Sequence, residues 1–317
     1  MTQHEAQEIA IELLKTMPLP DYSDDADKGD RGKLLVIAGS QRLPGTAILA
    51  ARAALRVGCG TVRVAAPASV AVQIGIAVPE LMVLPLPETS SGTIARSALP
   101  LLEAQYEVCR AAVIGPGLDE HSETCELVRE VVAKTPLPLV VDAEALTAWS
   151  RGGKSTPYEN VETAGARIFT PHSQEMSILT GRDESVIEAK REITALGFVR
   201  VRKATLVLKG RETLIASPAG ELYRNKAGTR ALGTAGSGDV LAGIIGGLLA
   251  QNMEATQAAV WGVHLHALAG EAVTEDMGED GVMARDFLER LPFVMRYLRR
   301  QVMPRKDDRR PGLRRVS

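Results

Sequence analysis

Short apolar runs alternate with amphipathic stretches along most of this chain, and this alternation constrains its fold more than any other feature. Runs that are apolar on both faces and separated by helix patterns of 10–15 residues are typical of a parallel sheet covered on both sides. The pattern predicts an α/β fold with a mostly parallel central sheet. Strands are expected at 34–38, 61–65, 111–114, 139–141, 167–170, 205–209 and 214–216; helices are expected at 46–57, 122–134, 173–180, 185–196, 238–251, 255–276 and 284–298.

No linker divides the chain, so we expect a single folded domain at 28–300. The residues before it, 1–27, are predicted to form an N-terminal helix and lead-in. From residue 296 the chain carries nine Lys and Arg against two Asp, and a disordered basic tail is predicted at 301–317. A nucleic-acid-binding arm is the alternative, but the segment lacks the interleaved aromatics that single-strand binders use.

The net charge and the cysteines indicate which partners and which compartment to expect for this protein. The formal net charge of −2 gives no overall attraction to nucleic acid or to anionic membranes. Three cysteines (Cys59, Cys109 and Cys125) lie far apart in the sequence, which suits buried thiols in a reducing compartment. The N-terminus lacks the basic start of a signal peptide, and no apolar stretch reaches ~18 residues. We therefore expect a cytoplasmic protein without a membrane or nucleic-acid partner.

The segment TAGSGDVLAG at 234–243 carries the strongest chemical signal. Its glycines let the backbone approach a ligand, and the helix after them directs free amides and a positive dipole end at that ligand. Gly236, Ser237 and Gly238 are therefore predicted to bind phosphate, with Asp239 as the general base of a phosphoryl transfer. The alternative is that Asp239 caps the helix.

Three further clusters follow predicted strands, where ligands bind in open α/β sheets. The first, at 209–213, is a basic, glycine-containing strand end that suits a nucleotide phosphate or ribose, or else a hairpin turn. In the second, Pro171 holds His172 in a turn, with Ser173 as the predicted helix cap. In the third, Asp142 is predicted either to hold a metal-bound water or to cap the helix after it, close to the tight turn at 115–117. Walker A and dinucleotide-binding glycine motifs are absent from the sequence.

Taken in order, these segments resemble the NAD(P)H-hydrate dehydratase family of the ribokinase-like superfamily. The matching segments span about 28–275 and include KGDRGKLLVIAGS at 28–40, IGPGL at 114–118, VVDAEAL at 140–146, TPHSQEM at 170–176, VLKG-x-x-T at 207–213, TAGSGDVLAGIIGGLLAQ at 234–251 and HLHALAGE at 264–271. The resemblance implies a ribokinase-like three-layer αβα fold. It also implies repair of hydrated NADH or NADPH, in which ADP or ATP phosphorylates the hydrate hydroxyl with Mg²⁺ and phosphate is then eliminated.

The resemblance also implies a role for individual residues. Asp239 would be the base or contact the hydrate, and Gly238 would contact the nucleotide. No metal ligand is implied among the side chains, apart from Asp142 through a water. Relatives are often homo-oligomers, and the same is expected here. The remaining implied contacts are Lys209, Gly210, Arg211, Glu212 and Thr213 with the nucleotide, and Thr46, Ala47, Gly117 and His172 with the hydrate.

Two alternatives to this activity stay open. One is a ribokinase-like kinase that phosphorylates a small alcohol of the hydroxyethylthiazole or hydroxymethylpyrimidine type. The other is a nucleotide-binding relative without catalysis, which the departure of 228–233 (GTRALG) from the family's usual run allows.

Overall fold

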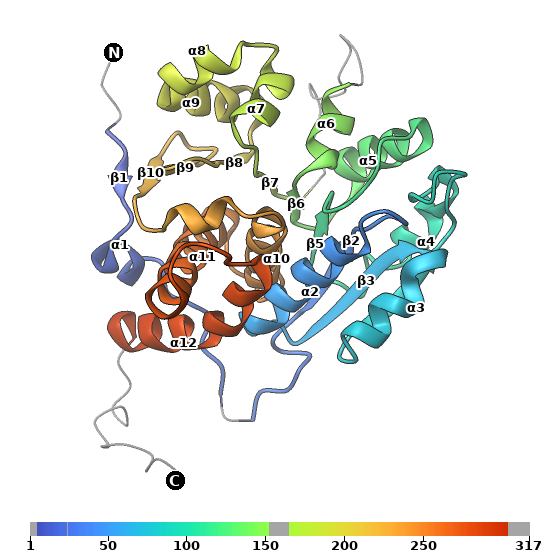
Figure 1. Cartoon of the computed structure of the whole chain (residues 1–317), viewed down its shortest axis with the longest axis horizontal. Coiled ribbons are helices and arrows are strands. Elements are labelled where there is room, and N and C mark those ends of the chain that lie inside the picture. The colour runs from blue at the N-terminus through green and yellow to red at the C-terminus, as the bar shows by residue number, and fades with distance from the viewer. Residues whose placement is uncertain (1–4, 24, 152–164, 304–317) are drawn as a thin grey trace.

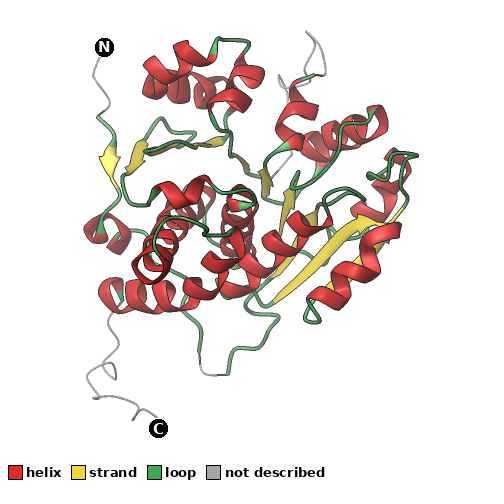
Figure 2. Ribbon diagram, viewed as in Figure 1, coloured by secondary structure: helices red, strands yellow, loops and turns green. Residues whose placement is uncertain are grey.

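A single sheet of ten strands organises the computed structural model, which describes residues 5–23, 25–151 and 165–303. The strand order is β1-β10-β9-β8-β7-β6-β5-β2-β3-β4. Figure 1 shows the sheet crossing the molecule between two groups of helices, and Figure 2 shows the same layers by secondary structure. The α/β prediction is confirmed.

Pairing is parallel from β4 through β8, and β9 runs antiparallel between β8 and β10. At the edge, β1 pairs in parallel with β10. The strands are β1 (Gln7–Glu8), β2 (Lys33–Ile37), β3 (Thr61–Pro67), β4 (Met82–Leu86), β5 (Ala111–Ile114), β6 (Leu139–Val141), β7 (Arg167–Phe169), β8 (Thr205–Leu208), β9 (Thr213–Ala216) and β10 (Leu222–Asn225).

Two aliphatic clusters, one on each face of the sheet, form the core. The first face is covered by α1 (Ile11–Lys15), α2 (Pro44–Arg56), α3 (Ala68–Ala77), α10 (Ser237–Ala250), α11 (Ala255–Met277) and α12 (Ala284–Val302). The second is covered by α4 (Leu99–Glu103), α5 (Ser122–Lys134), α6 (Glu144–Ser150), α7 (Ser173–Thr180), α8 (Glu184–Ala189) and α9 (Arg191–Arg202).

Helix α10 is buried along almost its whole length. It packs tightly against α2, since a Cβ atom added to Gly243 would lie 2.1 Å from the Ala50 carbonyl oxygen. Glycine at this position therefore lets the two backbones touch. This contact fixes the amino end of α10 relative to the sheet.

The structure corrects the prediction in two places. The single helix expected at 185–196 is two helices, α8 and α9, because the backbone of Lys190 leaves the helical region (φ −136°, ψ 44°). The expected N-terminal helix is instead the short strand β1 and the five-residue α1. Since Leu13 and Leu14 of α1 enter the core, this segment packs as part of the main fold.

One predicted segment falls largely on residues that are not described. The basic tail at 301–317 lies outside the described residues, except for 301–303. Helix α12 continues to Val302, just past the expected domain boundary at 300. All three cysteines are buried free thiols, as predicted. Across the described ranges, no helix is long and apolar enough to span a bilayer.

Candidate active site

The amino end of α10 meets the loops that follow β6 and β8. Gly236 is the N-cap of α10, with φ +86°, a conformation that favours glycine. Among the described residues, no side chain caps this helix. The predicted alternative in which Asp239 caps α10 is therefore wrong. The first amides of α10 keep their capacity to bind an anion.

Asp239 lies in the first turn of α10 and is only 8% exposed. Burial and the neighbouring Asp142 carboxylate raise the pKa of Asp239 to about 7, against the opposing effect of Lys209. A carboxyl group with a pKa near neutrality can accept a proton and release it again at physiological pH. The side chain thus has the electrostatic character of a general base.

Lys209, directly after β8, reaches into this site. Its ammonium lies 3.1 Å from Asp142 Oδ1 and 3.5 Å from Glu175 Oε2. A Cβ atom added to Gly238 would lie 3.5 Å from Lys209 Nζ, so the ammonium stands beside the first turn of α10. Burial acts to lower the pKa of Lys209, but the two carboxylates outweigh it and raise the pKa above its usual value. The lysine is therefore charged at neutral pH.

Asp142 is held by two donors at the end of β6. Its Oδ1 accepts hydrogen bonds from Thr170 Oγ1 at 2.6 Å and from Lys209 Nζ. The N-cap of α6 is Ala143, without a side-chain cap. Asp142 therefore does not cap that helix, which was one of the two predicted roles.

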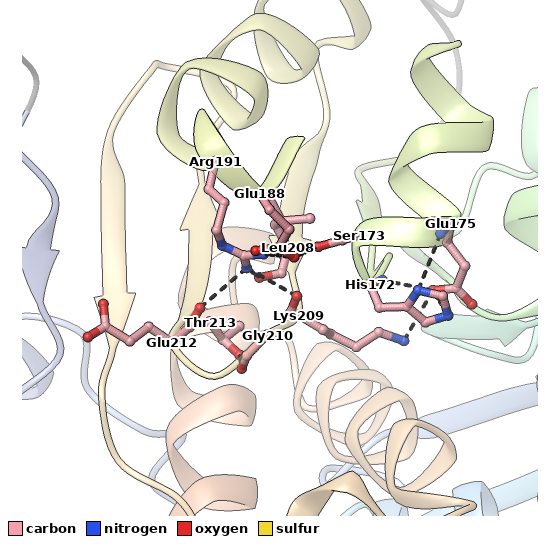
Figure 3. Close-up of polar contacts among 10 residues, drawn as sticks. All are labelled: His172, Ser173, Glu175, Glu188, Arg191, Leu208, Lys209, Gly210, Glu212 and Thr213. Atoms are coloured by element: carbon pink, nitrogen blue, oxygen red, sulfur yellow. Dashed lines mark hydrogen bonds and ion pairs between the residues drawn. The ribbon is translucent and has the colours of Figure 1, made fainter. Parts of the chain in front are cut away.

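His172 begins α7 and forms its cap together with Glu175. His172 Nδ1 accepts a hydrogen bond from the Glu175 amide at 3.3 Å, and Glu175 Oε2 accepts one from the His172 amide at 2.8 Å. The prediction that Ser173 caps α7 is wrong. The His172 imidazole nitrogen accepts the hydrogen bond that a Ser hydroxyl accepts in many helix caps. Figure 3 shows the Lys209 side chain directed at this pair. The His172 side chain itself is half exposed.

Residues 209–213 comprise the turn of the β8–β9 hairpin (209–212) and Thr213, the first residue of β9, so the hairpin alternative is confirmed. Their side chains do not share one surface. Lys209 points toward Glu175, whereas Arg211 and Glu212 line a cavity of about 460 Å³ on the side of α8 and α9. The turn therefore has an inner face at α10 and an outer face at this cavity.

Thr46, Ala47 and Gly117 lie where the β2 and β5 loops meet. A Cβ atom added to Gly117 (φ +67°) would lie 2.0 Å from Thr46 Oγ1, so the two residues are in direct contact. Ala47 is fully buried, so it presents no exposed surface to a ligand in this structure. Gly115, in the loop after β5, likewise packs directly on the Asp142 carbonyl. This contact brings the loop after β5 against the loop after β6.

Four polar residues of this region were not predicted as site residues. Glu175 was visible as the acidic residue three positions after His172, and Thr170 as the residue before the proline, but neither has a local signal of function. The third residue is His266, whose Nε2 lies 3.0 Å from the Oγ of the predicted phosphate-binding residue Ser237. Burial and the Lys209 charge lower the pKa of His266 to about 4, so this imidazole is neutral. The fourth residue, Arg191, comes from α9 and contacts the hairpin turn.

Comparison with known proteins identifies the family. A sequence model described as NAD(P)H-hydrate dehydratase matches residues 34–292. The chain belongs to the NAD(P)H-hydrate dehydratase family. It is 37% identical to the ADP-dependent (S)-NAD(P)H-hydrate dehydratase of Xanthomonas campestris, over 93% of this chain and 98% of that protein. It is 38% identical to the bifunctional NAD(P)H-hydrate repair enzyme of Moorella thermoacetica over 95% of this chain, but spans only 56% of that protein.

The solved structures agree with this membership. The ADP/ATP-dependent NAD(P)H-hydrate dehydratase of Bacillus subtilis, co-crystallised with ATP and Mg²⁺, superposes with a TM-score of 0.79 and 27% identity, over 93% of this chain and 99% of that one. The ribokinase-like αβα fold is thereby confirmed. These matches do not favour the alternative of a small-alcohol kinase.

Proposed function

We propose that this chain dehydrates hydrated NADH or NADPH to the usable cofactor and consumes ADP or ATP in doing so. One observation carries the proposal: the buried Asp239 carboxyl lies in the first turn of α10, and the Lys209 ammonium stands beside the preceding residue, Gly238, at the same helix end. A base and an anion-binding helix end in one place are what transfer of a phosphoryl group to an alcohol requires. Family membership supplies the alcohol, the ring hydroxyl of the hydrate.

In the first step, the hydrate's hydroxyl oxygen forms a bond to the terminal phosphorus of the nucleotide. The bond from that phosphorus to the bridging oxygen breaks, which releases AMP from ADP or ADP from ATP. Asp239 accepts the hydroxyl proton, and its pKa of about 7 suits this transfer at neutral pH.

In the second step, the bond from the ring carbon to the phosphorylated oxygen breaks and phosphate leaves. A proton is lost from the neighbouring ring carbon, and the ring double bond is restored. Hydroxide is a poor leaving group and phosphate a good one, which explains why a nucleotide is consumed.

The charge of the site explains a requirement for Mg²⁺. Asp142 and Glu175 pair with the Lys209 ammonium, and Asp239 is a third carboxyl within its electrostatic influence, so these carboxyl groups outnumber this cation. Among the described residues, no group of three or more His, Cys, Asp or Glu could hold a metal ion. Mg²⁺ commonly keeps several waters and binds through nucleotide phosphates and one or two carboxylates. Asp142 would hold such an ion through a water. When bound, the ion would neutralise phosphate charge.

We assign the remaining contacts to two faces of the site. Gly236, Ser237 and Gly238 would bind the transferred phosphate, and residues 209–213 the rest of the nucleotide. His172, Gly117 and Thr46 would contact the hydrate, and the buried Ala47 would support Thr46 from beneath. The contact between Gly117 and Thr46 supports their assignment to one face, and Glu175, between His172 and Lys209, would lie where the two faces meet.

The setting of the reaction is also a proposal. Three free, buried cysteines suit a reducing cytoplasm. A homo-oligomer would cover Phe293 and Tyr297, which lie one turn apart on α12 and are each 58% exposed. Light scattering on a sizing column would measure the oligomeric mass, and a monomer would contradict this part of the proposal.

Incubation of the protein with hydrated NADH or NADPH, Mg²⁺ and either ADP or ATP tests the activity. We expect the absorbance of the reduced nicotinamide to return, with one inorganic phosphate released per cofactor restored. A stable phosphorylated product without phosphate release would indicate a kinase instead. No restored absorbance with either nucleotide would contradict the proposal.

A further inference from the structure

We propose that Arg191 is a positioning residue for nucleotide binding and that it fixes the hairpin turn at 209–213 in its binding conformation. The inference rests on the proposed function, because it takes this turn to bind the nucleotide. Arg191 is the first residue of α9, and only 17% of its side chain is exposed. Nothing in its local sequence marks it as part of the site.

One nitrogen of the Arg191 guanidinium holds three carbonyl groups of the hairpin. Arg191 Nη2 donates to the carbonyl oxygens of Leu208 at 2.9 Å, Lys209 at 3.1 Å and Glu212 at 3.3 Å. These contacts fix peptide planes at both ends of the turn (Figure 3). A charged donor makes stronger hydrogen bonds than a neutral one, so the restraint is substantial.

A second nitrogen of the same guanidinium contacts the start of α7, where His172 lies. Arg191 Nη1 donates to Ser173 Oγ at 3.1 Å and to Glu188 Oε1 at 3.1 Å. Ser173 follows His172 at the start of α7. Arg191 therefore joins the hairpin turn to the turn that carries His172, and it brings together elements that follow β7 and β8.

Gly210 provides independent support. Its φ is not positive, so the backbone conformation does not require glycine here. A Cβ atom added to Gly210 would lie 2.7 Å from Arg191 Nη2, closer than side-chain carbons approach. The space beside this glycine is therefore filled by the Arg191 guanidinium. Glycine at 210 and arginine at 191 form one packing unit.

The direction of Lys209 depends on this unit. The Lys209 amide donates to the Pro171 carbonyl at 2.8 Å while its own carbonyl accepts from Arg191, so both of its peptide groups are held. Its side chain then extends to Asp142 and Glu175 beside α10. Among the described residues, Arg191 forms hydrogen bonds and ion pairs with residues other than Asp239. Its loss should therefore weaken nucleotide binding while leaving the proton transfer intact.

Equilibrium binding of ADP and ATP, measured by calorimetry without the hydrate, tests the inference. For Arg191→Met we expect the nucleotide Kd and KM to rise about tenfold or more, with kcat within about threefold of wild type. Arg191→Lys should remain impaired, because an ammonium cannot reproduce the fork of the guanidinium. Arg200→Met, an exposed position on the same helix, is the matched control and should bind nucleotide like wild type.

Gly210→Ala supplies a second test if Arg191→Met is poorly folded. It should weaken nucleotide binding by displacing the guanidinium, and the double variant should be no worse than the more impaired single variant, because both changes break one unit. Wild-type affinity in Arg191→Met or Arg191→Lys would overturn the inference. A lower kcat and melting temperature with an unchanged nucleotide Kd would also overturn the inference, because that result is expected if Arg191 has only a structural role. Failure of the wild-type protein to bind either nucleotide would overturn the proposed function itself.

Discussion

An ion pair of 3.1 Å joins the Lys209 ammonium, after β8, to the Asp142 carboxylate, after β6. These residues are 67 positions apart in the sequence. Both influence Asp239, in opposite directions: Asp142 raises its pKa and Lys209 lowers it. Burial is the largest cause of the raised pKa of Asp239, and the pair adjusts that pKa in the group to which we assign the chemistry.

Asp239→Asn should lower kcat a hundredfold or more, the contribution typical of a positioned base. The amide keeps the size of the side chain but cannot accept the proton. Nucleotide Kd should change little, since in the proposed site the anion would be bound by the amides of α10 and by Lys209. Rate measurements together with calorimetric titration of ADP would check both statements. An unchanged rate would remove Asp239 from the mechanism. If the wild type binds nucleotide but shows no turnover, the non-catalytic alternative holds.

The pH dependence of kcat/KM should report the Asp239 carboxyl. The base must be deprotonated, and its pKa is raised to about 7, so the rate should fall as pH drops through about 7. Asp142→Asn removes a charge that raises this pKa, and the acid limb should then move to lower pH. Asp183→Asn, at an exposed position before α8, serves as the control. An acid limb that stays in place in Asp142→Asn would contradict the electrostatic coupling.

The same raised pKa predicts a cost in stability. Burial of the Asp239 carboxylate penalises its charged form, so the penalty is absent below the unfolded pKa of 3.8 and complete above about 7. Asp239→Asn should therefore be more stable than wild type at pH 8, and the difference should be larger than at pH 5 by on the order of 2 kcal/mol. Urea unfolding at the two pH values would measure it. A difference independent of pH would contradict the assignment.

Gly238→Ala should fold normally but bind nucleotide at least about tenfold less tightly. The added methyl group would meet only Lys209 Nζ at 3.5 Å and Asp142 Oδ2 at 3.8 Å, which are ordinary contacts. A methyl group there would nevertheless stand where a phosphate approaches the first amides of α10. The melting temperature should stay near that of wild type, as Ala is favoured over Gly in a helix.

Gly243→Ala is the informative contrast within the same helix. Its added methyl group would lie 2.1 Å from the Ala50 carbonyl oxygen, so we expect a large loss of stability. If Gly238→Ala binds nucleotide like wild type, the phosphate does not lie at the amino end of α10.

The sequence by itself determined the parallel α/β core and indicated where the candidate site lies. Runs such as 111–114 and 139–141 are apolar on both faces, and only a strand covered by helices on both sides buries them fully. The glycines and polar residues that follow such strands then share one edge of the sheet. Asp239, Lys209 and His172 could be named for this reason, because each lies in a local pattern.

Only the tertiary structure decided how these groups are paired. Which carboxylates meet Lys209 depends on strand order, and the presence of Arg191 beside the turn depends on how α9 packs over β8 and β9. The cap of α7 was misassigned because several side chains can accept the same amide proton, and neighbouring packing selects among them. The pKa of Asp239 likewise follows from burial and from charges distant in sequence, which residue patterns do not encode.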